Sequence, residues 1–94
     1  MRFNVEDALE AMNLKDGSYI RIDQDVFRIV VDWSIEVKNG ESSLIPAAFL
    51  EFASSSSIRL PFYLIYYSEY DILSVEESAQ YAATWELNRL KEGQ

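Results

Sequence analysis

The sequence predicts an α+β domain in which about four antiparallel strands form a meander, with one helix at each end of the chain. Two observations carry this order of helix, four strands and helix. Odd positions are apolar throughout residues 26–37, and Asn39-Gly40, a strong signal for a tight hairpin turn, follows directly. Both ends of the chain instead show apolar residues at helical spacing. All 94 residues are expected to form one domain, residues 1–94.

The first element is expected to be a helix that begins after Asn4. Asn4 is a good N-cap, and Asp7, three residues later, can answer it as in a capping box. The apolar residues that follow lie on one helical face: Val5, Ala8, Leu9 and Met12. Lys15-Asp16-Gly17 is expected to end the helix.

A long hairpin should follow a weakly alternating strand at residues 18–23. A segment with apolar odd positions and mostly polar even positions is typical of a strand with one buried face. A two-residue turn at Asn39-Gly40 sets Arg28 against Glu51 and Phe27 against Phe52. Opposite charges and apolar side chains agree with this one register, which predicts a third strand over residues 41–53.

A helix is the alternative prediction for residues 46–53. Pro46 suits a first helical position, and it lacks the N–H that a central strand would need. Ile45, Ala48, Phe49 and Phe52 also recur at helical spacing. If the segment is a strand, its pairing should bulge or end near Pro46.

A fourth strand and a second helix complete the predicted fold. Residues 54–57 are a serine run that reads as a turn, and residues 58–67 are rich in β-branched and aromatic side chains. Ser74 and Glu77 form a capping box for the last helix. Glu86 falls within the apolar arc of that helix, so we expect either a pair with Arg89 or a buried carboxylate.

The residue types of most catalytic and metal sites are missing from the chain. It has no cysteine and no histidine, and its glycines form no phosphate-binding loop. Asp32 and Glu51 should share a strand face with Arg28 and Arg59, where solvated ion pairs are the ordinary explanation. We therefore expect no enzyme activity, no metal site and no cofactor.

The charge of the chain bears on its partners. Sixteen acidic and eight basic residues give a net charge of −8, which repels nucleic acid and anionic membranes and attracts basic surfaces. The same charge also simply keeps a small protein in solution. Neither a signal-peptide pattern nor a membrane-spanning apolar stretch is visible, so a cytoplasmic location is expected.

The sheet face opposite the odd positions is expected to be an interface with a partner or with a second subunit. Its side chains are too apolar to face water on a small monomer. Either the sheet curls on itself, or a helix lies behind it, or this face meets another molecule, for which buried tyrosines are typical. The residues concerned are Val30, Ile45, Phe49, Tyr63, Ile65 and Tyr67.

Binding is therefore favoured over chemistry. The leading hypothesis is a protein-binding module, such as an inhibitor or an immunity-type protein, that engages a basic protein without binding nucleic acid itself. Enzymes that process nucleic acid are among the basic partners that fit. The alternative is a subunit of a homodimer or higher oligomer with a self-complementary sheet face, and a small-ligand binder ranks below both. In size and charge alone the chain is similar to phage-encoded inhibitors, immunity proteins and secretion chaperones, and no motif supports that similarity.

Overall fold

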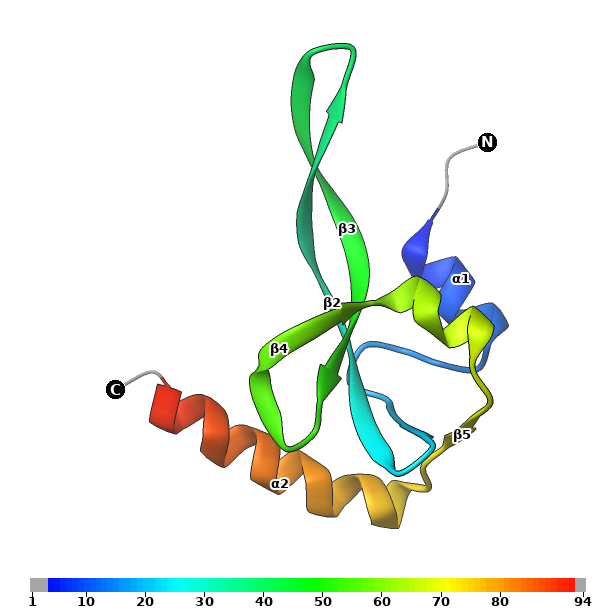
Figure 1. Ribbon diagram of the computed structural model, residues 1–94, viewed down its shortest axis with the longest axis vertical. Helices are drawn as coiled ribbons and strands as arrows, with labels where there is room; N and C mark the ends of the chain where they lie inside the picture. The colour runs from blue at the N-terminus through cyan, green and yellow to red at the C-terminus, as the bar shows by residue number, and fades with distance from the viewer. Residues whose placement is uncertain (1–3, 93–94) are drawn as a thin grey trace.

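The computed structural model describes residues 4–92, with the side chains of residues 55–57, 88, 89 and 92 excepted. Five antiparallel strands form one sheet in the order β4-β3-β2-β1-β5, with a helix before it and a helix after it (Figure 1). This confirms the predicted α+β class, with one strand more than expected. The elements are α1 (Val5–Ala11), β1 (Tyr19–Ile22), β2 (Asp25–Lys38), β3 (Glu41–Phe52), β4 (Ser55–Pro61), the 3-10 helix η1 (Phe62–Tyr67), β5 (Tyr70–Ile72) and α2 (Val75–Glu92).

Both helices begin at the side chains that the sequence indicated. The Asn4 Oδ1 atom accepts hydrogen bonds from the backbone N–H groups of Glu6 and Asp7, at 2.9 and 3.3 Å. The Ser74 Oγ atom accepts from the Glu77 N–H at 3.2 Å, and the Glu77 carboxylate accepts from the Ser74 hydroxyl. These bonds satisfy backbone donors that have no partner inside the helix.

The β2–β3 hairpin has the predicted register. Arg28 lies opposite Glu51 and Phe27 opposite Phe52, and Asn39 and Gly40 form the turn with φ of 54° and 81°. Residues 46–52 are therefore strand and not helix. Pairing with β2 also continues through Pro46, which lies opposite Trp33, so the expected interruption there is absent.

The predicted fourth strand begins and ends earlier than expected, because it starts at Ser55, inside the serine run that was expected to be a turn. It ends at Pro61, and residues 62–67 turn into η1. Proline cannot donate to a sheet ladder, and after Pro61 the side chain of Ile65 enters the core instead of alternating along an edge. The chain then crosses to the other edge of the sheet, where β5 pairs with β1.

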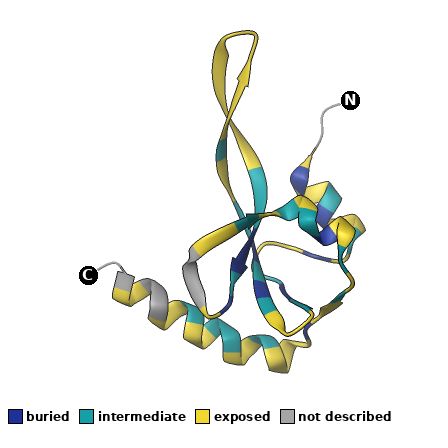
Figure 2. Cartoon of the chain, viewed as in Figure 1, coloured by how far each residue is buried: buried dark blue, intermediate teal, exposed yellow. Residues whose placement is uncertain are grey.

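The two helices cover opposite faces of the sheet, so of the three alternatives for the second face the structure has the one in which a helix lies behind it. On the side of the odd-numbered residues of β2, α1 and η1 enclose the main core, formed by Leu9, Leu14, Ile20, Phe27, Ile29, Leu50 and Ile65. On the other side Tyr81 and Ala82 of α2 pack against a smaller cluster of Tyr19, Ala53 and Leu73. The buried residues lie around the crossing of β2 and β3 (Figure 2).

The far end of the β2–β3 hairpin extends beyond both cores (Figure 1). We call residues 32–47 the arm. The chain has a radius of gyration of 14.3 Å, whereas a compact domain of this length has about 12 Å. The difference reflects the arm, whose residues are mostly exposed (Figure 2). Within the described residues, no helix has the length and apolar character needed to cross a membrane.

Candidate protein-binding surface

The structure does not bring the six predicted interface residues together. Val30 and Phe49 form a cross-strand pair and are half-buried on the face that α2 covers, and Ile45 lies further along that face, on the arm. Ile65 is 1% exposed and belongs to the core on the opposite face, so its assignment to an interface is wrong.

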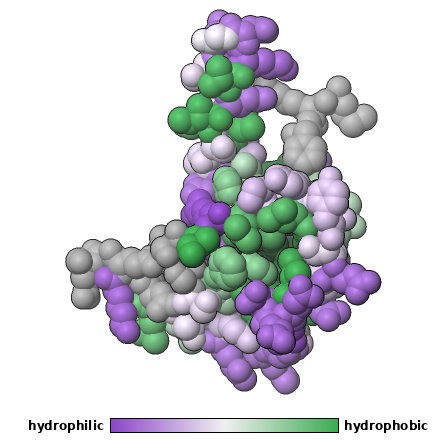
Figure 3. Space-filling view, in the orientation of Figure 1, coloured by the Kyte–Doolittle hydropathy of each residue, from purple (hydrophilic) through white to green (hydrophobic). Residues whose placement is uncertain are grey.

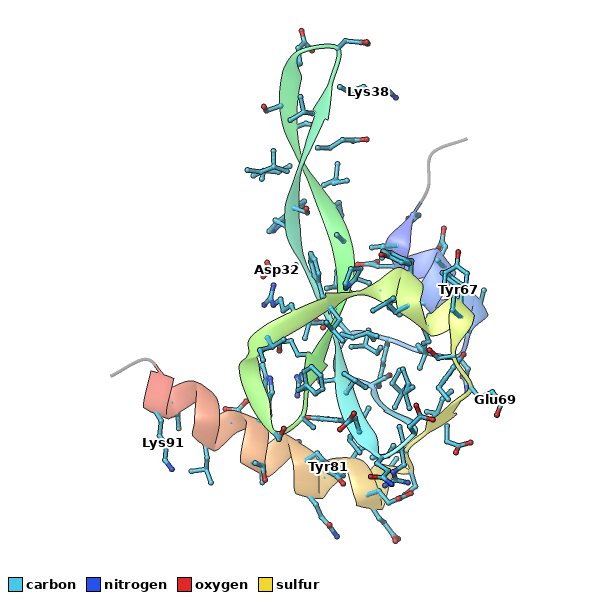
Figure 4. The ribbon with its side chains drawn as sticks, viewed as in Figure 1. Asp32, Lys38, Tyr67, Glu69, Tyr81 and Lys91 are labelled. Atoms are coloured by element: carbon cyan, nitrogen blue, oxygen red, sulfur yellow. The ribbon has the colours of Figure 1, made fainter. Side chains whose placement is uncertain are left out.

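Tyr63 and Tyr67 are exposed, but they lie on η1 and not on the arm (Figure 4, where Tyr67 is labelled). Their rings contact each other edge to face, 6.4 Å apart between centroids. The prediction had continued the alternation of a strand through residues that form a helix. The expected single apolar face is therefore divided among three places.

Of the two alternatives predicted at Glu86, a pair with Arg89 or a buried carboxylate, the structure contradicts the buried carboxylate. Glu86 is exposed, and the side chain of Arg89 lies outside the described residues. The sheet-facing side of α2 carries Tyr81, Ala82 and Trp85 instead. Among the described side chains the buried carboxylate is instead Glu51, which is 3% exposed and so is not the solvated ion-pair partner that was expected.

Glu51 lies in a polar cluster between the sheet and α2. Its Oε1 atom accepts a hydrogen bond from the Arg59 Nε at 2.8 Å, and its Oε2 atom accepts one from the Trp85 Nε1 at 3.1 Å. The Arg28 guanidinium stacks on the Trp85 ring, 3.9 Å from its centroid. We call these four residues, together with Asp32, the Glu51 cluster. A buried charge that is paired and hydrogen-bonded avoids most of the cost of losing water.

Asp32 connects the Glu51 cluster to the arm. Its Oδ2 atom accepts a hydrogen bond from Arg59 at 2.9 Å, and this bond is the main reason that the pKa of the Asp32 carboxyl is lowered. The pKa of Arg59 is raised, first by its bond to Glu51 and then by its bond to Asp32. The sequence grouped these charges correctly on one face. It could not show that Trp85, 34 positions from Glu51, covers that carboxylate.

The arm has an exposed row of large apolar side chains on its other face. Trp33, Ile35 and Leu44 are 65%, 69% and 66% exposed, and Ile35 lies directly opposite Leu44. Val37 continues the row toward the turn. In the space-filling view, apolar side chains gather in the middle of the arm, below a hydrophilic tip (Figure 3). Exposed apolar groups that adjoin one another are typical of a contact surface.

The charged residues of the arm lie on the face opposite this apolar row. Asp32, Glu36 and Lys38 occupy even positions of β2, and Glu41 pairs with Lys38 beside the turn. Asp32 marks the base of the arm and Lys38 its tip (Figure 4). The arm therefore has one apolar face and one face that carries its charged residues, three acidic and one basic, together with Ile45.

The edges of the hairpin are protected against further strands near the base of the arm. Because Lys38 and Glu41 flank a two-residue turn, odd-numbered residues of β2 direct their N–H groups away from β3. The Val31 N–H donates to the Asp16 Oδ1 at 3.0 Å, and the Trp33 N–H donates to the Asp32 Oδ1 at 2.8 Å. On the other edge, Pro46 has no N–H to offer. Such features oppose edge-to-edge pairing at the base of the arm.

A cavity of about 470 Å³ lies where the arm leaves the body of the protein. We call it the acidic hollow. Its apolar lining is Leu9, Leu14 and Val31, and its exposed charged lining is Glu6, Glu10, Lys15 and Asp16. Val31 precedes Trp33 and Ile35 on the same face of β2, so the apolar row runs into this hollow.

No group of carboxylates suited to holding a metal ion occurs among the described residues. Comparisons with protein-family models, curated proteins and solved structures each found no match for this chain. Function must therefore be argued from the surfaces of the protein itself.

Proposed function

We propose that this chain is a small acidic protein-binding module and that the apolar row of the arm is its contact surface. The observation that carries the proposal is the exposure of Trp33, Ile35 and Leu44 side by side on a projecting hairpin. Burying apolar surface is worth about 25 cal/mol per Å² before the costs of association are counted. Tryptophan in particular is enriched among the residues that dominate binding free energies.

The shape of the arm supports contact with a larger molecule. A two-stranded hairpin alone is only marginally stable in water, and at its base this one is held by the sheet and by both cores. The base therefore holds the two strands of the arm in register, so the apolar row is already formed before a partner binds. A partner would therefore meet a preorganised surface, which lowers the entropic cost of association.

The charge of the chain favours a basic protein partner. A net charge of −8 attracts a basic surface and speeds the encounter with it. An inhibitor or immunity-type role in the cytoplasm, without catalysis and without direct contact to nucleic acid, fits this combination of acidity and an apolar contact surface. The partner is then a basic protein, which would include enzymes that act on nucleic acid.

A homo-oligomer subunit is the second candidate function. The same row supports it, because two arms stacked face to face would bury both sets of apolar side chains. The charged side chains of the arm lie on the face away from such a contact, and the net charge of −8 on each chain opposes the association of two copies. Light scattering of the purified protein across a concentration series decides between a monomer and an oligomer.

The decisive experiment compares two substitutions of exposed apolar residues by aspartate. Trp33→Asp changes the apolar row, and Val75→Asp changes the exposed first residue of α2 as a matched control. Each tagged protein is used to capture partners from a lysate of the source organism, with quantification by mass spectrometry. A protein that is captured by the wild type and by Val75→Asp, and lost with Trp33→Asp, supports the proposal. Equal capture by all three chains contradicts it.

A further inference from the structure

We infer that the apolar row and the acidic hollow together accept a basic amphipathic helix of a partner protein. This inference rests on the proposed function of the arm and adds the form and charge of the segment that it binds. Three features support it. Helix α1 covers only part of the hairpin face that carries the apolar row, the edges at the base of the arm are protected, and charged side chains line the hollow.

The first feature is the incomplete helical layer on the face of the hairpin that carries the odd-numbered residues of β2. Helix α1 has seven residues and so covers about 10 Å of length, whereas the fourteen residues of β2 extend over about 40 Å. Leu9 of α1 packs in the core with Ile29 and Leu50. Beyond Val31 the same face continues uncovered as Trp33, Ile35 and Val37. A second helix placed beyond α1 would cover the row as α1 covers the base of the hairpin.

The second feature selects a helix over an added strand. A strand added along the full row would need the outward N–H groups at the base of the arm, and those of Val31 and Trp33 are already bonded to carboxylates. Pro46 supplies none on the opposite edge. A helix satisfies its own backbone hydrogen bonds and needs only an apolar surface, so these protected edges do not affect it.

The third feature sets the charge of the segment. Glu6, Glu10 and Asp16 line the hollow with a single ammonium group, that of Lys15. Glu6 and Glu10 are four residues apart and therefore lie on one side of α1. The apolar row ends among these carboxylates, so a helix lying on the row brings its end or its flank to them. Lysine or arginine at that point is complementary, whereas a second copy of this chain, at −8, would add like charge.

The experiment is a selection of helical peptides from a large phage-displayed library with random sequence. Selection on the wild-type protein should enrich amphipathic peptides rich in lysine and arginine. The enriched peptides are then synthesised, and their affinities are measured by calorimetry at low and at high salt. Binding of these peptides should weaken as salt rises, because screening acts on exposed charges.

Three variants test where the selected peptides bind. Trp33→Asp should lower their affinity by about tenfold or more. The double variant Glu6→Gln/Glu10→Gln should lower it about three- to tenfold and reduce its salt dependence. The control Glu69→Gln/Glu86→Gln removes the same charge from exposed positions outside the hollow and should change the affinity less than twofold. Thermal unfolding of each variant shows whether its fold is intact.

Each other outcome contradicts the inference in a different way. Peptides that need Trp33 but are neutral or acidic, or that ignore Glu6 and Glu10, overturn the inference and leave the proposed function standing. Enriched peptides that bind the Trp33→Asp variant as well as the wild type overturn both. A selection that enriches no peptide overturns the inference alone, because the proposed function does not require a helical partner segment. Self-association that Trp33→Asp abolishes would make the occupant a second copy of the chain, and that also overturns the inference.

Discussion

The two halves of the β2–β3 hairpin share one ladder and one alternation of side chains, yet they have opposite surroundings. In the half nearer the body, Ile29 and Leu50 are buried under α1 and η1 on one face, and Glu51 is buried under α2 on the other. In the arm, Ile35 and Leu44 form an equivalent apolar pair and are exposed. Apolar alternation therefore indicates which side chains share a face, and the extent of the covering layer determines which of them are buried.

The largest expected difference in stability comes from the same substitution, leucine to alanine, made once in each half of the hairpin. Leu50→Ala should lower the free energy of unfolding by about 2–4 kcal/mol, because it leaves a cavity in the main core. Leu44→Ala on the arm should lower it by less than about 0.5 kcal/mol, because that side chain is already exposed to water. Urea denaturation followed by circular dichroism measures both. Similar losses for the two variants would show that the arm is packed in solution.

The second comparison concerns acidic residues on the face of the hairpin that carries the even-numbered residues of β2. Glu51 belongs to this face because it lies opposite Arg28. Glu51→Ala should cost about 2 kcal/mol of stability, because Arg59 and Trp85 lose their shared acceptor in a buried position. Glu36→Ala on the exposed arm should change stability by about 0.5 kcal/mol or less. Chemical denaturation again provides the values. Equal effects would mean that α2 does not cover Glu51.

The third comparison concerns the edges of the arm. Pro46→Val restores an N–H on the outer edge of β3, where no further strand lies beside the described part of the arm. We expect little change in stability, about 0.5 kcal/mol or less, together with increased self-association at high concentration. Sedimentation velocity measures this, with Pro61→Val at the end of β4 as the control proline. A Pro46→Val protein that stays as monodisperse as wild type would argue against edge protection.

The smallest expected effect is a pH dependence at the junction of the two halves. The pKa of Asp32 is lowered from its ordinary value of 3.8, first by the hydrogen bond from Arg59. A lowered pKa in the folded state contributes stability above the unfolded value, and this contribution is lost as the pH falls through the folded value. Wild type should therefore lose a small amount of stability below about pH 4 that Asp32→Asn does not lose. Melting temperatures measured from pH 3 to pH 7 test this, and parallel curves would contradict it.

Much of the hairpin could be predicted because its determinants are local. The Asn39-Gly40 turn sets the register, and that register places Arg28 opposite Glu51 without information from the rest of the chain. The caps at Asn4 and Ser74 are equally local. The exposed apolar row was missed, although its signal was present: a fourteen-residue strand is too long for a seven-residue helix to cover.

The sequence by itself determined the helix starts, the hairpin turn and the sharing of faces within β2 and β3, because these depend on residues close together in the chain. Only the tertiary structure decided that residues 62–67 leave the sheet, that α2 covers the opposite face from α1, and that Glu51 and not Glu86 is the buried carboxylate. Burial depends on which distant elements lie over a side chain and how far they extend. Ile29 and Ile35 both lie in the same alternation of apolar and polar residues. Ile29 is buried because α1 and η1 lie over it, and Ile35 is exposed because they end before it.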